Sequence, residues 1–180
     1  RSRARRVEDA RAGAETPRYT PVIIADRSVG LHVANAVSAA LYAREKTGKG
    51  QRVDVPMFES LLQSVLGEHL GGYTFVPQLG EGGYRHMLTP YRRPYETKDG
   101  YVCVLIYNDK HWKAFFEMIG RGDMLADARF ATTEGRSQNY DAVYGFVAEE
   151  ITRQSTAHWL EAFERADIPV QRMNTIDDIV

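Results

Sequence analysis

The chain has 180 residues, of which 43% are hydrophobic, and its 23 basic and 24 acidic residues give a net charge of -1. This composition is typical of a globular protein with a packed core, and it argues against a strongly basic nucleic-acid binder or a partner of anionic membranes. The single cysteine, Cys103, excludes an internal disulfide framework and a cysteine-based metal site, so we expect a reducing, cytoplasmic setting. No apolar run is long enough for a transmembrane helix.

The first part of the chain alternates between apolar runs and helical periodicity. Residues 1–18 are polar and are predicted to be a linker or surface segment. "PVIIA" (21–25) predicts a short buried strand that ends at Asp26. "SVGLHVANAVSAALYAREK" (28–46) has one apolar face and predicts a helix, with Gly48 available as its left-handed cap.

A second strand and helix are predicted to follow. "QRVDV" (51–55) alternates polar and apolar residues, and Pro56 suits the first turn of a helix. Strand, helix, strand and helix over residues 19–73 predict an α/β segment with parallel strands. Because a single β-α-β unit cannot cover a parallel sheet, we expect this segment to be the trailing part of a larger sheet.

The pattern changes after residue 73. Residues 74–86 are rich in glycine and are predicted to be a linker or loop, and residues 87–168 predict a small α+β domain. Its hairpin is indicated by "YETKDGYVCVLIY", where Asp99-Gly100 favours a tight turn. Amphipathic helices are predicted at 109–120, 140–154 and 156–167, with Ser155 as an N-cap; Trp112, Phe115 and Phe116 are candidates for the core, and so is Cys103 as an inert thiol.

Three places in the sequence are candidates for chemistry. Asp26 is placed either as a nucleophile or acid/base at the end of a strand, or as the cap of the following helix. Gly80–Gly83 form either a loop that approaches a ligand or an ordinary linker, and their spacing fits no P-loop or dinucleotide motif. Asn108 either caps a helix or faces a ligand. The five histidines show no metal-site spacing, so no metal is expected.

Three stretches resemble the family III CoA-transferases, the CaiB/BaiF family that includes formyl-CoA transferase, carnitine CoA-transferase and α-methylacyl-CoA racemase. They are "ADRSVGLHVANAVSAALYAREKTGKGQRVDVPMFES", "TPYRRPYETKDGYVCVLIYNDKHWKAFFEMIG" and "IPVQRMNTIDDI". The resemblance implies a two-domain, interlocked homodimer. In it, residues 19–73 end a large nucleotide-fold domain, 87–168 form the small domain, and 169–180 return toward the large domain.

The resemblance also assigns roles to residues. It implies that Asp26 is the catalytic nucleophile, which forms an aspartyl-CoA intermediate as CoA passes from an acyl-CoA to a carboxylic acid. Gly80, Gly82 and Gly83 match the family's glycine loop, with fewer consecutive glycines than formyl-CoA transferases carry, which argues against formyl or oxalate specificity. Asn108 stands where racemases tend to carry glutamate, which favours a transferase.

The implied substrates are an acyl-CoA and a carboxylic acid, with coenzyme A acting as a thioester and no metal, nucleic acid or membrane involved. The chain resembles the central piece of a protein about twice as long, so we expect it to be inactive by itself. Two alternatives stay open: an α-methylacyl-CoA racemase or epimerase, and a non-enzymatic interaction domain.

Overall fold

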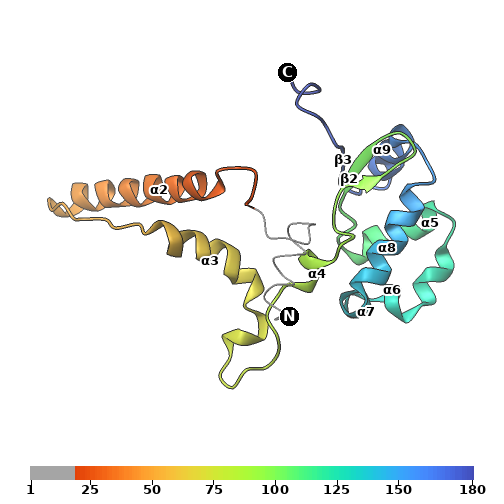
Figure 1. Ribbon diagram of the computed structural model, residues 1–180, viewed down its shortest axis with the longest axis horizontal. Helices are drawn as coiled ribbons and strands as arrows, with labels where there is room; N and C mark the ends of the chain where they lie inside the picture. Colours follow the sequence, from red (N-terminus) through yellow and green to blue (C-terminus); the bar gives the residue numbers. More distant parts are fainter. Residues whose placement is uncertain (1–18) are drawn as a thin grey trace. The chain divides into compact units, whose positions relative to one another are not determined.

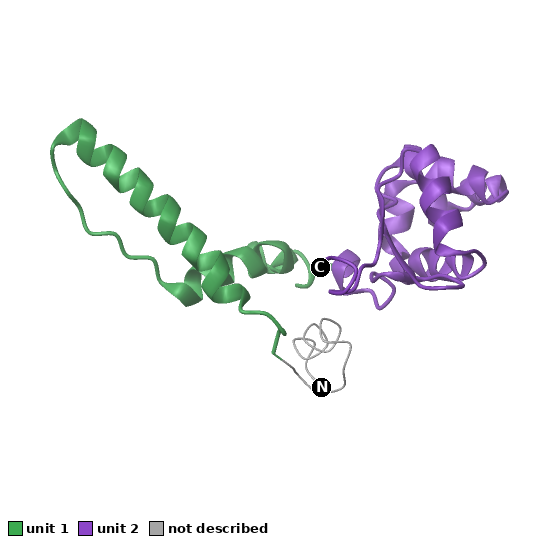
Figure 2. Cartoon of the chain, turned by 90° about the horizontal axis from the view of Figure 1, so that it is seen from above, with its two compact units in different colours: residues 1–84 green, residues 85–180 purple. Residues whose placement is uncertain are grey.

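The computed structural model describes residues 19–180 (Figure 1). The chain divides into two compact units, with the division after residue 84 (Figure 2). The linker predicted for residues 1–18 lies outside the described residues. Among the helices of the described residues, none is both long and apolar enough to cross a membrane.

The first unit is built from helices. Helix α2 (Ile24–Thr47) contacts helix α3 (Met57–His69), and the short 3₁₀ helix η1 (Gly71–Thr74) follows. Gly48 ends α2 with a φ of 70°, and its N–H donates to the carbonyl of Arg44 at 2.8 Å. The predicted glycine cap is therefore confirmed, and Pro56 precedes the first turn of α3 as its N-cap.

The two strands predicted in this unit are wrong. Residues 19–84 contain no strand in the structure: α2 already begins at Ile24, and residues 51–55 have no regular secondary structure. A strand is held by a ladder of backbone hydrogen bonds to a neighbour, and these apolar stretches have no neighbouring strand among the described residues. The α/β character predicted for residues 19–73 is thus not found there, and helices take its place.

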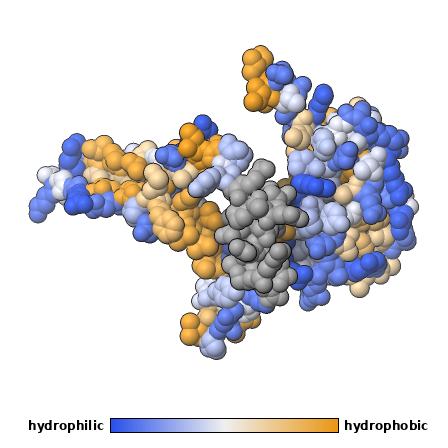
Figure 3. Space-filling model, in the orientation of Figure 1, coloured by the Kyte–Doolittle hydropathy of each residue, from blue (hydrophilic) through white to orange (hydrophobic). Residues whose placement is uncertain are grey.

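The helices of the first unit expose much apolar surface (Figure 3). Leu31 is 72% exposed and Phe58 is 71% exposed, and Val29 is the one hydrophobic residue of α2 that is buried. Further exposed apolar side chains on α2 are Val33, Val37, Leu41 and Tyr42. Contiguous apolar surface of this kind is typical of faces that pack against other protein.

The second unit contains a small antiparallel sheet of three strands in the order β1-β2-β3. They are β1 (Tyr95–Glu96), β2 (Tyr101–Val104) and β3 (Val170–Arg172). Tyr95 pairs with Val102, so the predicted hairpin is confirmed.

The hairpin turn is fastened to the helix region of the same unit. The Asp99 carboxylate accepts from the N–H of Thr156 at 2.7 Å, and the hydroxyls of Thr97 and Thr156 lie 2.8 Å apart. Hydrogen bonds from Thr156 lower the pKa of Asp99. These hydrogen bonds hold the hairpin turn against the N-terminus of the last helix.

The second unit also contains seven helical segments. They are α4 (Arg85–Leu88), α5 (Asp109–Met118), η2 (Gly122–Ala126), α6 (Ala128–Ala131), α7 (Thr133–Gln138), α8 (Tyr140–Ile151) and α9 (Thr156–Arg165). Of these segments, α8 and α9 contact the sheet. The three long helices predicted here are confirmed within three residues at each end. The hydroxyl of Ser155 accepts from the N–H of His158, as expected of an N-cap.

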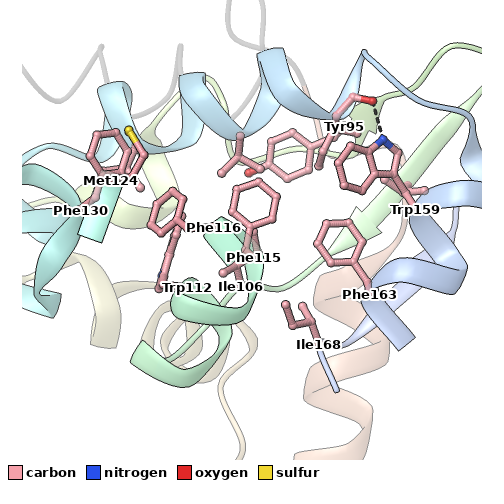
Figure 4. Close-up of a cluster of buried hydrophobic side chains, with 14 residues drawn as sticks. Tyr95, Ile106, Trp112, Phe115, Phe116, Met124, Phe130, Trp159, Phe163 and Ile168 are labelled. Carbon is pink, nitrogen blue, oxygen red and sulfur yellow. Dashed lines mark hydrogen bonds between the residues drawn. The ribbon is translucent and has the colours of Figure 1, made fainter. Parts of the chain in front are cut away.

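One hydrophobic core joins the sheet to α5, η2, α6, α8 and α9 (Figure 4). It contains Tyr95, Val102, Ile106, Trp112, Phe115, Phe116, Met124, Phe130, Val143, Val147, Ile151, Trp159, Phe163 and Ile168. The indole N–H of Trp159 donates to the carbonyl of Ile151 at 2.7 Å, which joins α9 to α8. Packing of this apolar surface is the main source of stability for the unit.

Cys103 does not belong to this core, contrary to expectation. Its side chain is exposed, while its neighbour Val102 is fully buried. Successive side chains of a strand point to opposite faces, so only one of these two residues can face the helices.

Candidate functional site

Asp26 lies in the first turn of α2, and its side chain is exposed. It does not cap the helix, because Ile23 occupies the N-cap position without a side-chain hydrogen bond. The capping interpretation is therefore wrong, as is the strand expected before Asp26. Its expected place at the start of a helix is correct.

The Asp26 carboxylate has few charged neighbours. Among the described residues it takes part in no hydrogen bond or ion pair. The only other acidic or basic residue of its helical turn is Arg27, its sequence neighbour. The peptide dipoles of a helix favour negative charge in the first turn. A carboxylate whose oxygens are uncommitted can act as a nucleophile toward an electrophilic carbonyl group.

The glycine loop folds back onto the end of α3. The N–H of Gly83 donates to the carbonyl of His69 at 2.7 Å, and the N–H of Gly72 donates to the carbonyl of Glu81 at 3.3 Å. The N–H of Leu79 donates to the carbonyl of Gly72 at 3.3 Å. Residues 80–83 are therefore held by backbone hydrogen bonds and differ from a free linker.

The glycines are required by this close approach of two backbone segments. A Cβ atom on Gly72 would overlap the backbone of Gly80, and one on Gly82 would overlap the ring of Tyr73. Gly83 has a φ of 97°, which residues with a side chain rarely adopt. No hydrogen bond joins Asp26 to this loop in the described part of the chain.

Replacing Gly72 with alanine is expected to open the loop. The added methyl group overlaps the backbone of Gly80, and overpacking of this kind costs about 1–3 kcal/mol. Hydrogen exchange is expected to accelerate at the amides of Leu79 and Gly83, whose acceptors lie across the loop.

Gly67→Ala is the matched control, because nothing lies within 4 Å of its Cβ position in α3. Alanine in a helix interior is favoured over glycine by about 0.5–1 kcal/mol, so this variant is expected to protect α3 and leave the loop unchanged. Unaltered exchange at Leu79 and Gly83 in Gly72→Ala would contradict the assigned loop contact.

Asn108 is the N-cap of α5. Its Oδ1 atom accepts from the N–H of His111 at 2.9 Å, and its Nδ2 atom lies 3.4 Å from Nε2 of His111. The capping interpretation is confirmed, and the side chain is also exposed. A contact between Asn108 and a ligand stays a prediction.

The residue after Asn108 fastens α5 to α7. Asp109 accepts a hydrogen bond from the guanidinium of the buried Arg136, which also donates to the carbonyl of Phe130 at 2.7 Å. The hydrogen bond from Arg136, followed by its positive charge, lowers the pKa of Asp109. The N-terminus of α5, and with it Asn108, is thereby fixed in position.

The sequence pattern did not reveal a cluster around His86. The His86 ring stacks on Tyr140 at 4.8 Å and on Tyr144 at 5.5 Å between centroids. Its Nε2 atom lies 2.7 Å from Nη1 of Arg92. Burial, followed by the charge of Arg92, lowers the pKa of His86. The signal that could have predicted this cluster is the spacing of the tyrosines, which places them on one face of a helix.

The predicted site residues fall into both units. Asp26 and the glycine loop belong to residues 1–84, and Asn108 belongs to residues 85–180. Among residues 19–180, no group of three or more His, Cys, Asp or Glu side chains could hold a metal ion.

The chain is similar to proteins that carry CoA-transferase names. An acetyl-CoA:oxalate CoA-transferase of Acetobacter aceti is 30% identical over 150 residues, which are 82% of this chain and 38% of that protein. A succinyl-CoA:glutarate CoA-transferase of Mus musculus is 26% identical over 88% of this chain and 36% of its own length. The chain thus spans less than half the length of the curated relatives it matches.

The fold is shared with a solved structure, and the family is shown by its sequence model. A crystal structure of Rv3272 from Mycobacterium tuberculosis matches with a TM-score of 0.74 at 23% identity, over 97% of this chain and 47% of that chain. The model of CoA-transferase family III matches residues 9–180, which confirms the resemblance seen in the sequence. The chain therefore belongs to CoA-transferase family III.

Proposed function

We propose that the chain is part of a CoA-transferase that moves CoA from an acyl-CoA donor to a carboxylic acid acceptor. The observation that carries the proposal is the family match over residues 9–180. The names of the relatives from Acetobacter aceti and Mus musculus also describe this reaction. Because these names specify different acceptors, the acceptor assigned to this chain is a carboxylic acid as a class.

In the proposed reaction, an oxygen of the Asp26 carboxylate attacks the thioester carbonyl carbon, the C–S bond breaks, and CoA leaves as a thiolate. The thiolate then attacks the aspartyl carbonyl of the mixed anhydride, which releases the donor acid and leaves aspartyl-CoA. The acceptor carboxylate then attacks the carbonyl of aspartyl-CoA and releases the CoA thiolate, which gives a second mixed anhydride. The thiolate attacks the acceptor's carbonyl in this anhydride, so that a new acyl-CoA forms and the Asp26 carboxylate is regenerated. The uncommitted state of this carboxylate among the described residues supports the role.

Water must be kept from both covalent intermediates, because hydrolysis would destroy each of them. We assign this task to the loop of Gly80, Gly82 and Gly83, and we assign Asn108 to a contact with the substrate. The support for the loop is its ordered backbone, in which Gly83 donates to His69.

We further propose that the protein acts as a homodimer whose large domain continues beyond these residues. The support is the exposed apolar surface of α2 and α3, including Leu31 and Phe58. We do not propose a racemase, since the relatives named above are transferases. Membership of an enzyme family also disfavours a purely structural role.

The proposal is tested with the complete protein, an acyl-CoA and an isotope-labelled acid, with oxalate and glutarate as the first two acceptors. Mass spectrometry is expected to detect the labelled acid as a CoA thioester. Release of free CoA and donor acid by hydrolysis, with no labelled thioester, would contradict transfer. The 180-residue chain alone, assayed in parallel, is expected to form none.

A further inference from the structure

A cavity of about 500 Å³ lies within the second unit. It is lined by the segment that enters β1, by the end of β2, by Tyr144 of α8 and by the residues that enter β3, including Arg92, Arg93, Tyr95, Cys103, Leu105 and Val170. Its volume falls within the range of roughly 300–1,000 Å³ that is usual for small-molecule sites. None of the residues assigned to CoA transfer above lines it.

The charge of the lining is positive. Arg92 and Arg93 both contribute to it, and no lining residue is acidic. Neither arginine forms an ion pair with a carboxylate of the described residues. The side chain of Arg93 is exposed. The Nη1 atom of Arg92 lies 2.7 Å from Nε2 of His86. Because a guanidinium can only donate, this contact favours the neutral tautomer of His86 with Nε2 as acceptor. Both positive charges are thus available to an anion.

The remainder of the lining is mostly apolar. Leu105, Val170 and Pro169 are among its apolar residues, and Tyr95 and Ile106, which are each more than nine-tenths buried, join it to the core. A ligand that satisfies both parts of the lining carries an oxyanion on an apolar chain. Two guanidinium groups suit the paired oxygens of a carboxylate.

We propose that this cavity binds a free carboxylic acid, with its carboxylate held by Arg92 and Arg93 and its apolar chain along Cys103 and Leu105. The choice of a carboxylate over other oxyanions rests on the proposed function, in which one carboxylic acid is released from the acyl-CoA donor and another accepts CoA. Binding itself needs no thioester and no Asp26, so it can be measured apart from transfer.

The only cysteine of the chain provides the test, because Cys103 is exposed and lines the cavity. The 180-residue chain is treated with iodoacetamide, an uncharged reagent, with and without octanoate as the probe ligand. Mass spectrometry measures the rate at which Cys103 is alkylated. At about ten times its Kd, octanoate leaves roughly a tenth of the cavities empty and is expected to slow alkylation about tenfold. Acetate lacks the chain and octanol lacks the charge, so neither is expected to protect at that concentration.

Arg93→Gln is expected to raise the octanoate concentration needed for half protection at least about tenfold, equivalent to 1.4 kcal/mol. Arg165→Gln is the matched control, because Arg165 is an exposed arginine of the same unit that pairs with Glu161 and does not line the cavity. Circular dichroism verifies that each variant is folded; Arg93 is exposed, so its replacement leaves the core intact.

Three results would overturn the proposal: equal alkylation with and without octanoate, equal protection by octanol, or the same half-protecting concentration in both arginine variants. Protection by octyl phosphate without protection by octanoate would overturn the carboxylate assignment. All of these outcomes are distinct from a failure of CoA transfer, which is measured with a thioester in the complete protein.

Discussion

Asp26→Asn in the complete protein is expected to abolish CoA transfer while leaving the fold intact. An amide is nearly the same size as a carboxylate, and Asp26 neither caps α2 nor forms a hydrogen bond or ion pair among the described residues. The amide is a far weaker nucleophile, so neither the mixed anhydride nor aspartyl-CoA can form. Loss of a covalent nucleophile typically raises the barrier by roughly 4 kcal/mol or more, a rate loss of about a thousandfold.

Asp54→Asn is the matched control for the change in charge. Asp54 is also an exposed aspartate of the first unit, and its carboxylate pairs with Arg52 at 2.7 Å. Such surface pairs contribute little, about 0–1 kcal/mol, so this variant is expected to retain both transfer and stability. Hydroxylamine added during turnover is expected to label Asp26 in the wild type alone. If Asp26→Asn keeps more than about a tenth of the rate, a barrier change under 1.4 kcal/mol, the assignment is wrong.

The elements that could be predicted from the sequence are those specified by local signals. The hairpin of β1 and β2 depends on the Asp99-Gly100 turn, and α5 and α9 begin at side chains that cap them, Asn108 and Ser155. Each of these interactions joins residues only a few positions apart. The aromatic core of the second unit follows from the same helical periodicity.

The elements that could not be predicted depend on distant partners. An apolar run such as 21–25 forms a strand only beside a neighbour, and without one it leads into α2. Gly72 and Gly80 approach each other through backbone contacts that no residue pattern specifies. The cavity lined by Arg92 combines residues from four separate parts of the chain, one of them Tyr144 of α8, so its positive lining is visible only in the folded unit.

Phe115→Ala is expected to cause the largest loss of stability in the second unit. Its side chain is 0% exposed, and its ring lies 6.0 Å from Phe163 and 5.7 Å from Phe116 between centroids. The residue thus joins α5 to α9 at the centre of the core (Figure 4). Truncating a buried phenylalanine costs about 3–5 kcal/mol through lost burial and the remaining void. This is a large part of the roughly 5–15 kcal/mol that stabilises a typical domain.

Urea unfolding monitored by tryptophan fluorescence measures this loss in the second unit itself, because both tryptophans, Trp112 and Trp159, are buried in its core. Tyr107→Ala is the matched control: it removes an aromatic ring of the same unit that is 71% exposed, and its expected effect is within about 0.5 kcal/mol. A lower urea midpoint for Phe115→Ala at an unchanged m-value identifies a change in stability rather than in the denatured state. A loss of stability below about 1 kcal/mol in Phe115→Ala would contradict this prediction, because a loss of that size is ordinary for substitutions outside a core. Contacts other than the Phe115 ring would then hold α5 and α9 together.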